Sequence, residues 1–202
     1  RIALVNFTYG TNLKWQGGWP KVNIIDRQDI SAALTKAKNR GADFIIALPH
    51  WGVESERRHS RGQEELASWL VENGADAVIG AHPHVVQDST VIGGAPVFYS
   101  LGNAVSNMSA PNTRIELAVK LTFTRDWNGD MTMLEPEVTY LWCSLPGRLG
   151  DSYTTIAVRD YIGKRHLWKD PSDYDKMIAT YLHVKRATGI KDEIKGESQG
   201  SK

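Results

Sequence analysis

The sequence has little cysteine, no long apolar run and almost no net charge. Cys143 is the one cysteine among 202 residues, so no internal disulfide forms, which fits a reduced compartment and equally an exported protein that needs no bridge. No stretch approaches the roughly 20 apolar residues that span a bilayer. The 24 Lys and Arg against 23 Asp and Glu leave a formal charge of +1, too little to attract nucleic acid. We therefore expect no nucleic-acid partner.

An initiating methionine and the apolar length of a signal peptide are also missing. Arg1 leads directly into the strand-like run Ile2–Thr8, so we expect the chain to be a piece of a longer protein. Its composition, 41% hydrophobic and 23% charged, is that of a globular chain with room for a buried core.

Strand and helix patterns alternate in the first half of the chain. Periodic apolar residues predict a helix from the capping Asp26 to Asn39 and another over Gln63–Glu72. Each is followed by a short apolar run typical of an inner parallel strand, Ala42–Leu48 and Ala75–Ile79. Strand, helix and strand joined by right-handed crossovers make the expected fold class α/β.

The second half is predicted to form antiparallel hairpins and then helices. The Asn128-Gly129 dipeptide is a strong hairpin signal. The expected strands are Val85–Val91, Val97–Leu101, Ile115–Thr124 and Met131–Trp142, and the expected helices are Thr155–Ile162 and Ser172–Ala187. We expect the polar tail, 191–202, to be disordered.

The loop Tyr9–Ile25 is long enough to suggest a function, with Trp15 and Trp19 flanking a Gly-Gly pair. These tryptophans either grip a polymer chain or serve as packing residues.

Three of the six histidines follow two predicted neighbouring strands: His50 after the first, His82 and His84 after the second. In an α/β sheet, ligands bind beyond the carboxyl ends of the strands, and ends of such strands lie roughly 5 to 10 Å apart. Pro83 is expected to hold His82 extended, with the imidazoles of His82 and His84 facing the same side. The histidines are either solvated loop residues or ligands of a shared ion, and imidazoles suit zinc, manganese or iron.

Other polar residues near these histidines have both a functional and a plain interpretation. Glu54 lies on the same face as His50 if the segment turns helically, and it either orients His50, holds water or is simply exposed. Arg57 and Arg58 contact an anionic substrate or belong to a solvated loop. Asn103 hydrogen-bonds near the site or forms a turn. His59 is assigned no metal role.

The motif order resembles the CapA family of bacterial capsule and poly-γ-glutamate biosynthesis proteins, which is similar to calcineurin-like metallophosphoesterases. The residues that carry the resemblance, over about Ile2 to Asn103, are Pro49-His50-Trp51-Gly52 with Glu54, then Gly74-Ala75-Asp76, Gly80-Ala81-His82-Pro83-His84-Val85-Val86-Gln87 and Tyr99-Ser100-Leu101-Gly102-Asn103.

The resemblance implies part of a metallophosphoesterase-like α/β/β/α sandwich, with parallel strands followed by antiparallel hairpins. Residues 1–142 would be the C-terminal part of the CapA-like domain, 143–190 a helical extension and 191–202 the tail. His50, His82 and His84 would correspond to ligands of a dinuclear divalent-metal centre, Mn, Zn or Fe, with Glu54 and Asn103 as neighbouring motif residues.

The family's earlier Gly-Asp, glutamate and Asn-His motifs have no counterpart here, because Gly129-Asp130 falls in a turn and Gly150-Asp151 precedes a predicted helix. The missing ligands and the catalytic acid are therefore expected from the missing N-terminal part of the same fold, and this chain alone is expected to be inactive.

Two functions follow as hypotheses. One is a metal-dependent hydrolase or transferase acting on an anionic cell-surface polymer or a small-molecule precursor. The other is a non-catalytic polymer-binding or export component that keeps the fold, or a structural fragment with vestigial histidines. The resemblance also implies an extracytoplasmic, membrane-anchored or cell-surface protein, with membrane contact only through an upstream anchor or partner proteins.

Overall fold

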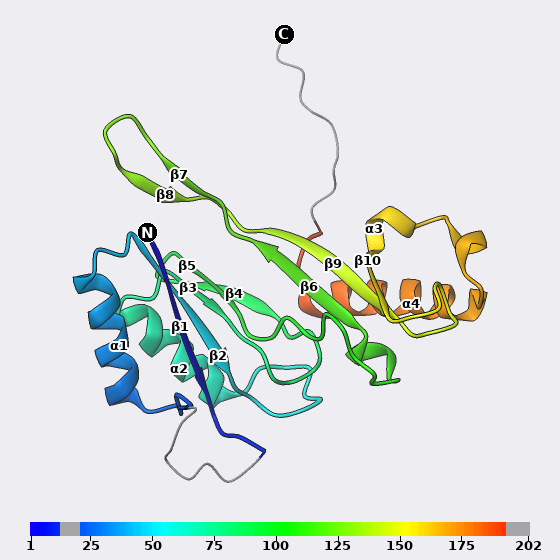
Figure 1. Ribbon diagram of the computed structural model, residues 1–202, viewed down its shortest axis with the longest axis horizontal. Coiled ribbons are helices and arrows are strands. Elements are labelled where there is room, and N and C mark those ends of the chain that lie inside the picture. The colour runs from blue at the N-terminus through cyan, green and yellow to red at the C-terminus, as the bar shows by residue number, and fades with distance from the viewer. Residues whose placement is uncertain (13–20, 193–202) are drawn as a thin grey trace. The chain divides into compact units, whose positions relative to one another are not determined.

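The computed structural model describes residues 1–12 and 21–192 and contains two compact units, Arg1–Gly102 and Asn103–Lys202 (Figure 1). Trp15 and Trp19 lie outside the described residues, as does the predicted disordered tail from residue 193 onward. The domain limit at residue 142, which the family resemblance implied, stays a prediction; in the structure this position falls within the second unit.

The first unit is built on a five-stranded sheet in the order β1-β2-β3-β5-β4. Its strands are β1 (Ile2–Thr8), β2 (Phe44–His50), β3 (Ala77–Ile79), β4 (Ser89–Ile92) and β5 (Ala95–Phe98). All neighbouring pairs are parallel except the β4–β5 hairpin. The predicted α/β class and the predicted parallel pairing of the two histidine-bearing strands are confirmed.

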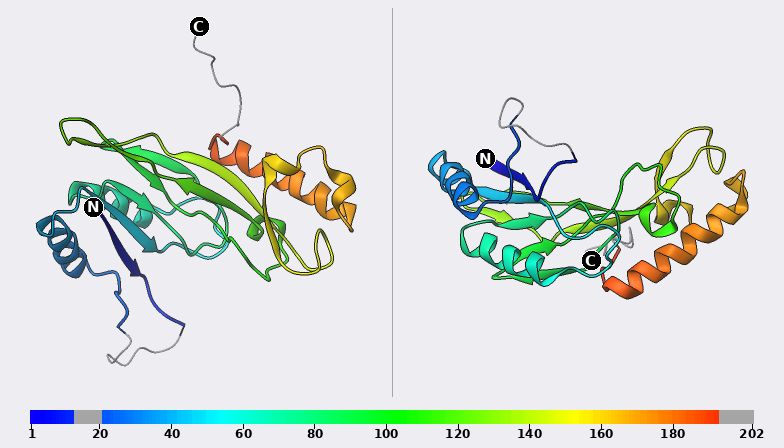
Figure 2. Two further views of the ribbon diagram at one scale, coloured as in Figure 1. Left: turned by 45° about the horizontal axis from the view of Figure 1, so that its top comes forward. Right: turned by 90° about the horizontal axis from the view of Figure 1, so that it is seen from below.

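Two helices cover one face of this sheet (Figure 2). Helix α1 (Arg27–Asn39) begins at Asp26, whose carboxylate accepts two backbone N–H groups, and α2 (Arg61–Glu72) begins at Ser60 with a capping box that includes Gln63. The core between helices and sheet contains Ile30 and Leu34, Leu66 and Leu70, with Phe7, Ala47, Val78 and Val97 from the strands. Because both helices return the chain in the same direction, the carboxyl ends of β1, β2 and β3 meet at one edge.

The second unit contains an antiparallel sheet in the order β10-β9-β6 and a two-stranded ribbon, β7–β8. Its strands are β6 (Ile115–Lys120), β7 (Phe123–Arg125), β8 (Met131–Met133), β9 (Glu137–Ser144) and β10 (Thr154–Ala157); its helices are α3 (Val158–Tyr161) and α4 (Pro171–Thr188), with 3₁₀ turns at Pro111–Thr113 and Arg165–Leu167. The predicted Asn-Gly hairpin is confirmed.

One predicted helix is wrong over its first half. The stretch from Thr155 pairs with β9 as strand β10, and only Val158–Tyr161 is helical. The β-branched residues Thr154, Thr155 and Ile156 favour a strand, and the edge of β9 supplies hydrogen-bond partners that a sequence window does not reveal.

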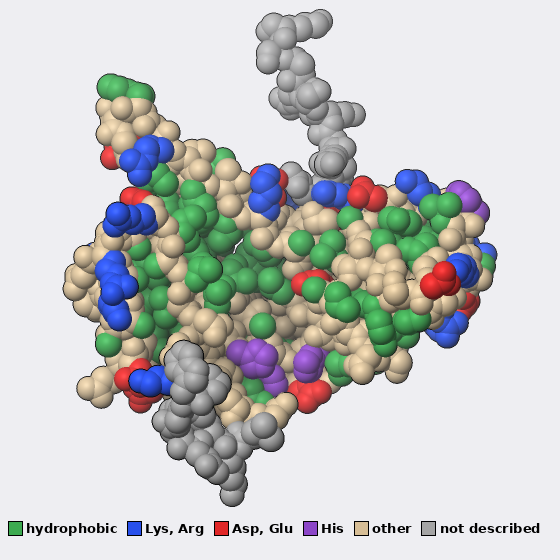
Figure 3. Space-filling view, in the orientation of Figure 1, with side chains coloured by type: hydrophobic (Ala, Val, Ile, Leu, Met, Phe, Trp, Pro, Cys, Tyr) green, Lys and Arg blue, Asp and Glu red, His purple; other side chains and the backbone are tan. Residues whose placement is uncertain are grey.

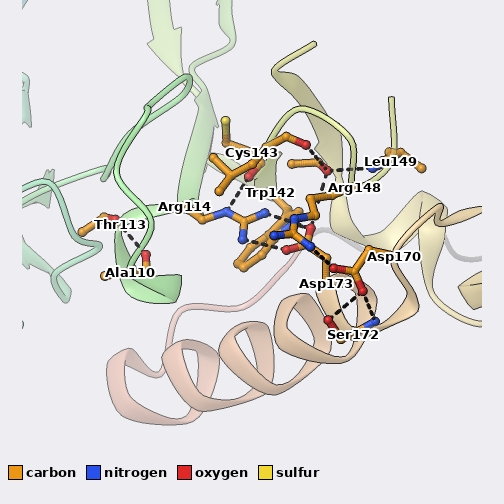
Figure 4. A network of polar contacts seen from close by, with 12 residues as sticks. Ala110, Thr113, Arg114, Trp142, Cys143, Arg148, Leu149, Asp170, Ser172 and Asp173 are labelled. Atoms are coloured by element: carbon orange, nitrogen blue, oxygen red, sulfur yellow. Dashed lines mark hydrogen bonds and ion pairs between the residues drawn. The ribbon is translucent and has the colours of Figure 1, made fainter. Parts of the chain in front are cut away.

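A buried ion pair in the second unit joins Arg114, the residue before β6, to Asp173 of α4 (Figure 4). The Arg114 guanidinium donates two hydrogen bonds to the Asp173 carboxylate, at 2.7 and 2.8 Å, and its Nε donates to the carbonyl of Cys143. The guanidinium also lies 4.2 Å from the centre of the Trp142 ring. Each nitrogen of this buried guanidinium therefore donates at least one hydrogen bond, to a carboxylate or a carbonyl oxygen.

None of the helices in the described part of the chain combines the length and the apolar character needed to cross a membrane.

Candidate histidine site

The predicted histidines come together at the carboxyl edge of the first unit's sheet. The Nδ1 atom of His82 lies 3.1 Å from Nε2 of His50, and the two ring centres are 4.7 Å apart. The ring of His84 is centred 6.0 Å from that of His82. Figure 3 shows histidine side chains gathered at the surface. The expected proximity of the three imidazoles is confirmed.

Strand pairing that continues past the end of β3 brings the chain segment of His82 beside His50. His50 forms a parallel bridge with Ala81, whose N–H donates to the carbonyl of Pro49 at 3.0 Å and whose carbonyl accepts from Trp51 N–H at 3.0 Å. The residue after Ala81 is His82, which in a regular strand would point to the opposite face of the sheet from His50. The contact between the two imidazoles therefore depends on His82 leaving the extended conformation, with φ 109°.

The expected extended conformation of the His82-Pro83-His84 segment is wrong. His82 has φ 109° and His84 has φ 61°, both in a region that side-chain-bearing residues rarely occupy. Tertiary contacts therefore override the restriction that Pro83 imposes on the residue before it. Such conformations cost about 1–3 kcal/mol each and concentrate at functional sites, where the surrounding structure holds them.

A close backbone approach forms the floor of the site. The N–H of Gly80 donates to the carbonyl of Phe98, and the buried indole of Trp51 donates to the carbonyl of Tyr99 at 2.8 Å. A Cβ on Gly80 would lie 2.2 Å from that Tyr99 oxygen and 2.5 Å from Trp51 Nε1. Glycine is therefore required two residues before His82.

Tyr9, which sequence reasoning did not single out, covers the histidine pair. Its ring centre lies 4.5 Å from that of His82 and 6.2 Å from that of His50, to which it is stacked at 8°. The N–H of Tyr9 donates to the carbonyl of His50. The sequence did offer a signal for Tyr9: it follows β1 directly, and the carboxyl end of β1 lies at the same edge as those of β2 and β3.

The loop between β2 and α2 carries three further predicted site residues, Glu54, Arg57 and Arg58. It is not helical, so the helical turn that would place Glu54 on one face with His50 does not form. The N–H of Ser55 instead donates to the carbonyl of Pro83 at 2.8 Å, which ties this loop to the histidine segment. Glu54, Arg57 and Arg58 are exposed on it.

Two buried glutamines, Gln63 and Gln87, are hydrogen-bonded to each other and to the same loop. Neither was predicted to be functional. The side-chain N–H of Gln63 donates to Oε1 of Gln87 at 2.9 Å. The amide nitrogen of Gln87 donates to the carbonyls of Glu56 and Arg58, at 2.8 and 3.1 Å. Gln87 lies three residues after His84, so one short segment supplies both a candidate ligand and a loop support.

His59, which was assigned no metal role, is a structural neighbour of the loop. Its Nδ1 lies 2.9 Å from Asp88 Oδ1, and its ring stacks on Tyr99 with centres 3.8 Å apart. Both interactions hold the end of the loop against the floor of the site.

The electrostatic environment of the histidine pair lowers the pKa of both imidazoles and so favours their neutral form. Burial lowers the pKa of His50, and the adjacent His82 and His84 lower it further. The pKa of His82 is lowered by burial and by His84, while the charge of Glu54 acts in the opposite direction. Neutral imidazole is the form that binds metal ions.

The donor set falls short of a complete metal site. Two imidazole nitrogens 3.1 Å apart have about the spacing of neighbouring ligands on one ion with metal–nitrogen bonds near 2 Å. Within residues 1–12 and 21–192, however, no group of three or more His, Cys, Asp or Glu side chains is arranged to hold a metal ion. A dinuclear centre is thus not assembled by these residues alone.

Asn103 begins the second unit, where its amide donates to the carbonyl of Thr113 at 3.0 Å. Its role, and those of Glu54, Arg57, Arg58 and the three histidines, stay predictions.

A groove of about 810 Å³ lies away from the histidines, between β1 and α1. It is lined by apolar residues such as Leu4 and Ile30, and β1 is the edge strand of the sheet. An uncharged edge strand of this kind can accept a further strand.

Comparison with known proteins identifies a family and individual relatives of this chain. Residues 1–108 match the family described as "Bacterial capsule synthesis protein PGA_cap". The PGA biosynthesis protein CapA of Bacillus subtilis (strain 168) is 31% identical over 130 residues, 63% of this chain and 34% of that protein. The capsule biosynthesis protein CapA of Bacillus anthracis is 40% identical over 84 residues, 40% of this chain and 20% of that protein. The chain thus aligns with only 34% and 20% of the length of these two relatives.

Among solved structures, the calcineurin-like phosphoesterase YfkN from Bacillus subtilis is similar over 85% of this chain and 47% of its own, with 17% identity and a TM-score of 0.38.

Proposed function

Because the chain belongs to the family of bacterial capsule synthesis proteins, we propose that it acts in the biosynthesis of an anionic capsule polymer, poly-γ-glutamate. The single observation that supports a site for this polymer is the His50–His82 contact, beside a loop that carries Arg57 and Arg58 and is tied to the same segment through Ser55. Guanidinium groups recognise carboxylates and phosphates by paired hydrogen bonds. The ligand is thus a polycarboxylate chain or an anionic small-molecule precursor.

The chemistry we propose is hydrolysis or group transfer that depends on a divalent metal, manganese, zinc or iron. The described residues supply imidazoles and no complete donor set. We propose that residues outside the described ones supply the further ligands, the site of the second ion and the acid, since the aligned segments cover only 34% and 20% of the two relatives. We expect the 202-residue chain alone to bind metal weakly and to hydrolyse no phosphoester.

A second candidate function is polymer binding without catalysis, in synthesis or export. The incomplete donor set favours it, because imidazoles and arginines can hold an anionic chain without an ion. Elemental analysis and a phosphoesterase assay on a protein of the relatives' length separate the two functions. Stoichiometric metal together with turnover supports the enzyme, and polymer binding without either supports the binding component.

We also propose an extracytoplasmic or cell-surface location, reached through an anchor or partner proteins, since the relatives are capsule and PGA biosynthesis proteins. Finding the intact protein in the cytoplasmic fraction of its host would overturn this proposal.

Calorimetric titration of the 202-residue chain with a γ-linked glutamate oligomer tests the polymer site directly. Replacement of both loop arginines, Arg57→Ala and Arg58→Ala, should weaken binding at least about tenfold if each contributes an ordinary charge-assisted hydrogen bond. Lys38→Ala, an exposed cation on α1, is the matched control. Equal affinity for all three proteins, or no binding by the unaltered chain, would refute the polymer site.

A further inference from the structure

The carboxamide of Gln87 is buried directly beneath the arginine-bearing loop. Gln87 is 1% exposed and Gln63 is 3% exposed, although both side chains are polar. Buried amides are costly unless their donors and acceptors are paired. Here the pairing runs from the start of α2 through both side chains to the loop.

The orientation of both amides follows from this chain of hydrogen bonds. The backbone N–H of Ser60 donates to Oε1 of Gln63 at 2.9 Å, so the contact of Gln63 with Gln87 comes from its nitrogen. Oε1 of Gln87 must accept that bond, and its nitrogen therefore faces the loop. Two hydrogens on that nitrogen meet two carbonyl acceptors, those of Glu56 and Arg58.

These two carbonyls flank Arg57 on either side. One buried amide therefore holds the backbone on both sides of Arg57. Gly52, with φ 87°, leaves space for the Gln63 amide, because a Cβ there would lie 2.8 Å from Gln63 Oε1. A side chain at position 52 would thus displace the Gln63 amide, so this position of the loop requires glycine.

We propose that Gln87 is a positioning residue for anion binding: its amide holds the Glu56–Arg58 backbone so that Arg57 and Arg58 face a polycarboxylate ligand beside the histidines. This inference rests on the proposed function, because it takes the ligand class from it. It adds a residue that touches no ligand and acts through the two arginines.

The first measurement reports on the loop without any ligand. Gln87→Leu removes both N–H donors of the carboxamide and replaces it with an apolar side chain of similar size. Hydrogen exchange at the N–H groups of Ser55 and Glu56, which donate to Pro83 and Val53, should become at least about tenfold faster, as expected when a buried hydrogen bond is lost. Ile30→Val, a conservative change in the core under α1, controls for a general loss of stability. The exposed Gln28→Leu on α1 controls for the loss of an amide.

The second measurement is a double-mutant cycle on affinity for a γ-linked glutamate oligomer. If Gln87 acts through the arginines, Gln87→Leu should weaken binding by about the same factor as Arg57→Ala with Arg58→Ala. Adding Gln87→Leu to that pair should then cause no further loss. A structural role alone would lower thermal stability and leave the affinity of the folded chain unchanged.

The outcomes are distinguishable. Full affinity in Gln87→Leu, or additive losses in the triple variant, would overturn this inference while the proposed function stands. Unchanged exchange at Ser55 and Glu56 would overturn it without reference to any ligand. No binding of the oligomer by the unaltered chain would overturn the proposed function, and this inference with it.

Discussion

Nδ1 of His82 lies 3.1 Å from Nε2 of His50, although the two residues are 32 positions apart. A hydrogen bond between these nitrogens requires one to donate and the other to accept, so both imidazoles cannot be fully protonated in this arrangement. The burial that lowers both pKa values acts in the same direction. Both effects favour the neutral imidazole, which is the form that binds metal ions.

Replacing a histidine of this cluster separates a ligand from a packing residue. In a protein of the relatives' length, His82→Ala or His84→Ala should reduce bound metal sharply and leave the fold intact, because ligands at strand ends contribute little to core burial. His59→Ala, whose partner is Asp88, should leave the metal content unchanged. Elemental analysis beside a melting curve measures both effects. If all three variants hold equal metal, and His82→Ala instead loses about 1 kcal/mol of stability, the cluster is structural.

Gly80→Ala should damage both stability and the histidine contact. Its Cβ would press on the Tyr99 carbonyl and the Trp51 indole, and overpacking of this kind costs about 1–3 kcal/mol. Gly62→Ala in α2 is the control, because its Cβ would meet only Ser60 Oγ at 3.9 Å. Urea denaturation compares the two variants. Equal urea midpoints for the two variants would show that the backbone around Gly80 accommodates a Cβ without loss of stability, and would contradict this prediction.

Breaking the buried Arg114–Asp173 pair should destabilise the second unit strongly. The two side chains are 3% and 2% exposed, so Asp173→Ala leaves a buried guanidinium without its anion, at a cost of about 3–5 kcal/mol. The solvent-exposed pair Arg165–Asp175 provides the control, and Asp175→Ala should leave the unfolding midpoint almost unchanged. Similar midpoints for both variants would contradict the assigned importance of the buried pair.

Glu116 predicts a pH dependence of stability. Burial raises its pKa from 4.5 to about 7, and its Oε2 is buried without a hydrogen-bond partner in the described residues. The folded state therefore holds this proton more tightly than the unfolded state. The stability contributed below pH 4.5 should be lost progressively as pH rises to about 7, by about 1–2 kcal/mol once solvent screening is allowed for.

Glu116→Gln should flatten this dependence between pH 4.5 and 7. Chemical denaturation at several pH values measures it, and a slope that persists in the variant would assign the effect to another group. Glu65→Gln is the control, because its carboxylate is exposed on α2.

Much of the first unit was predictable because its signals are local. Asp26 and Ser60 begin the two helices by capping them, and short apolar runs mark β2 and β3. Equivalent positions of His50 and His82 at two successive strand ends predicted their proximity, since parallel strands end at the same edge. The strand at Thr154–Ala157 was missed because its pairing partner, β9, is supplied by tertiary structure.

The sequence by itself determined the α/β class, the parallel pairing and the edge at which the histidines gather, because periodicity, caps and chain direction are properties of neighbouring residues. Tertiary structure alone decided the positive φ angles of His82 and His84, the cover by Tyr9 and the burial of Gln63 and Gln87 beneath the loop. Each of these depends on which distant backbone groups come within hydrogen-bonding distance. The backbone conformation that Pro83 favours for His82 is overridden because several such tertiary contacts act together.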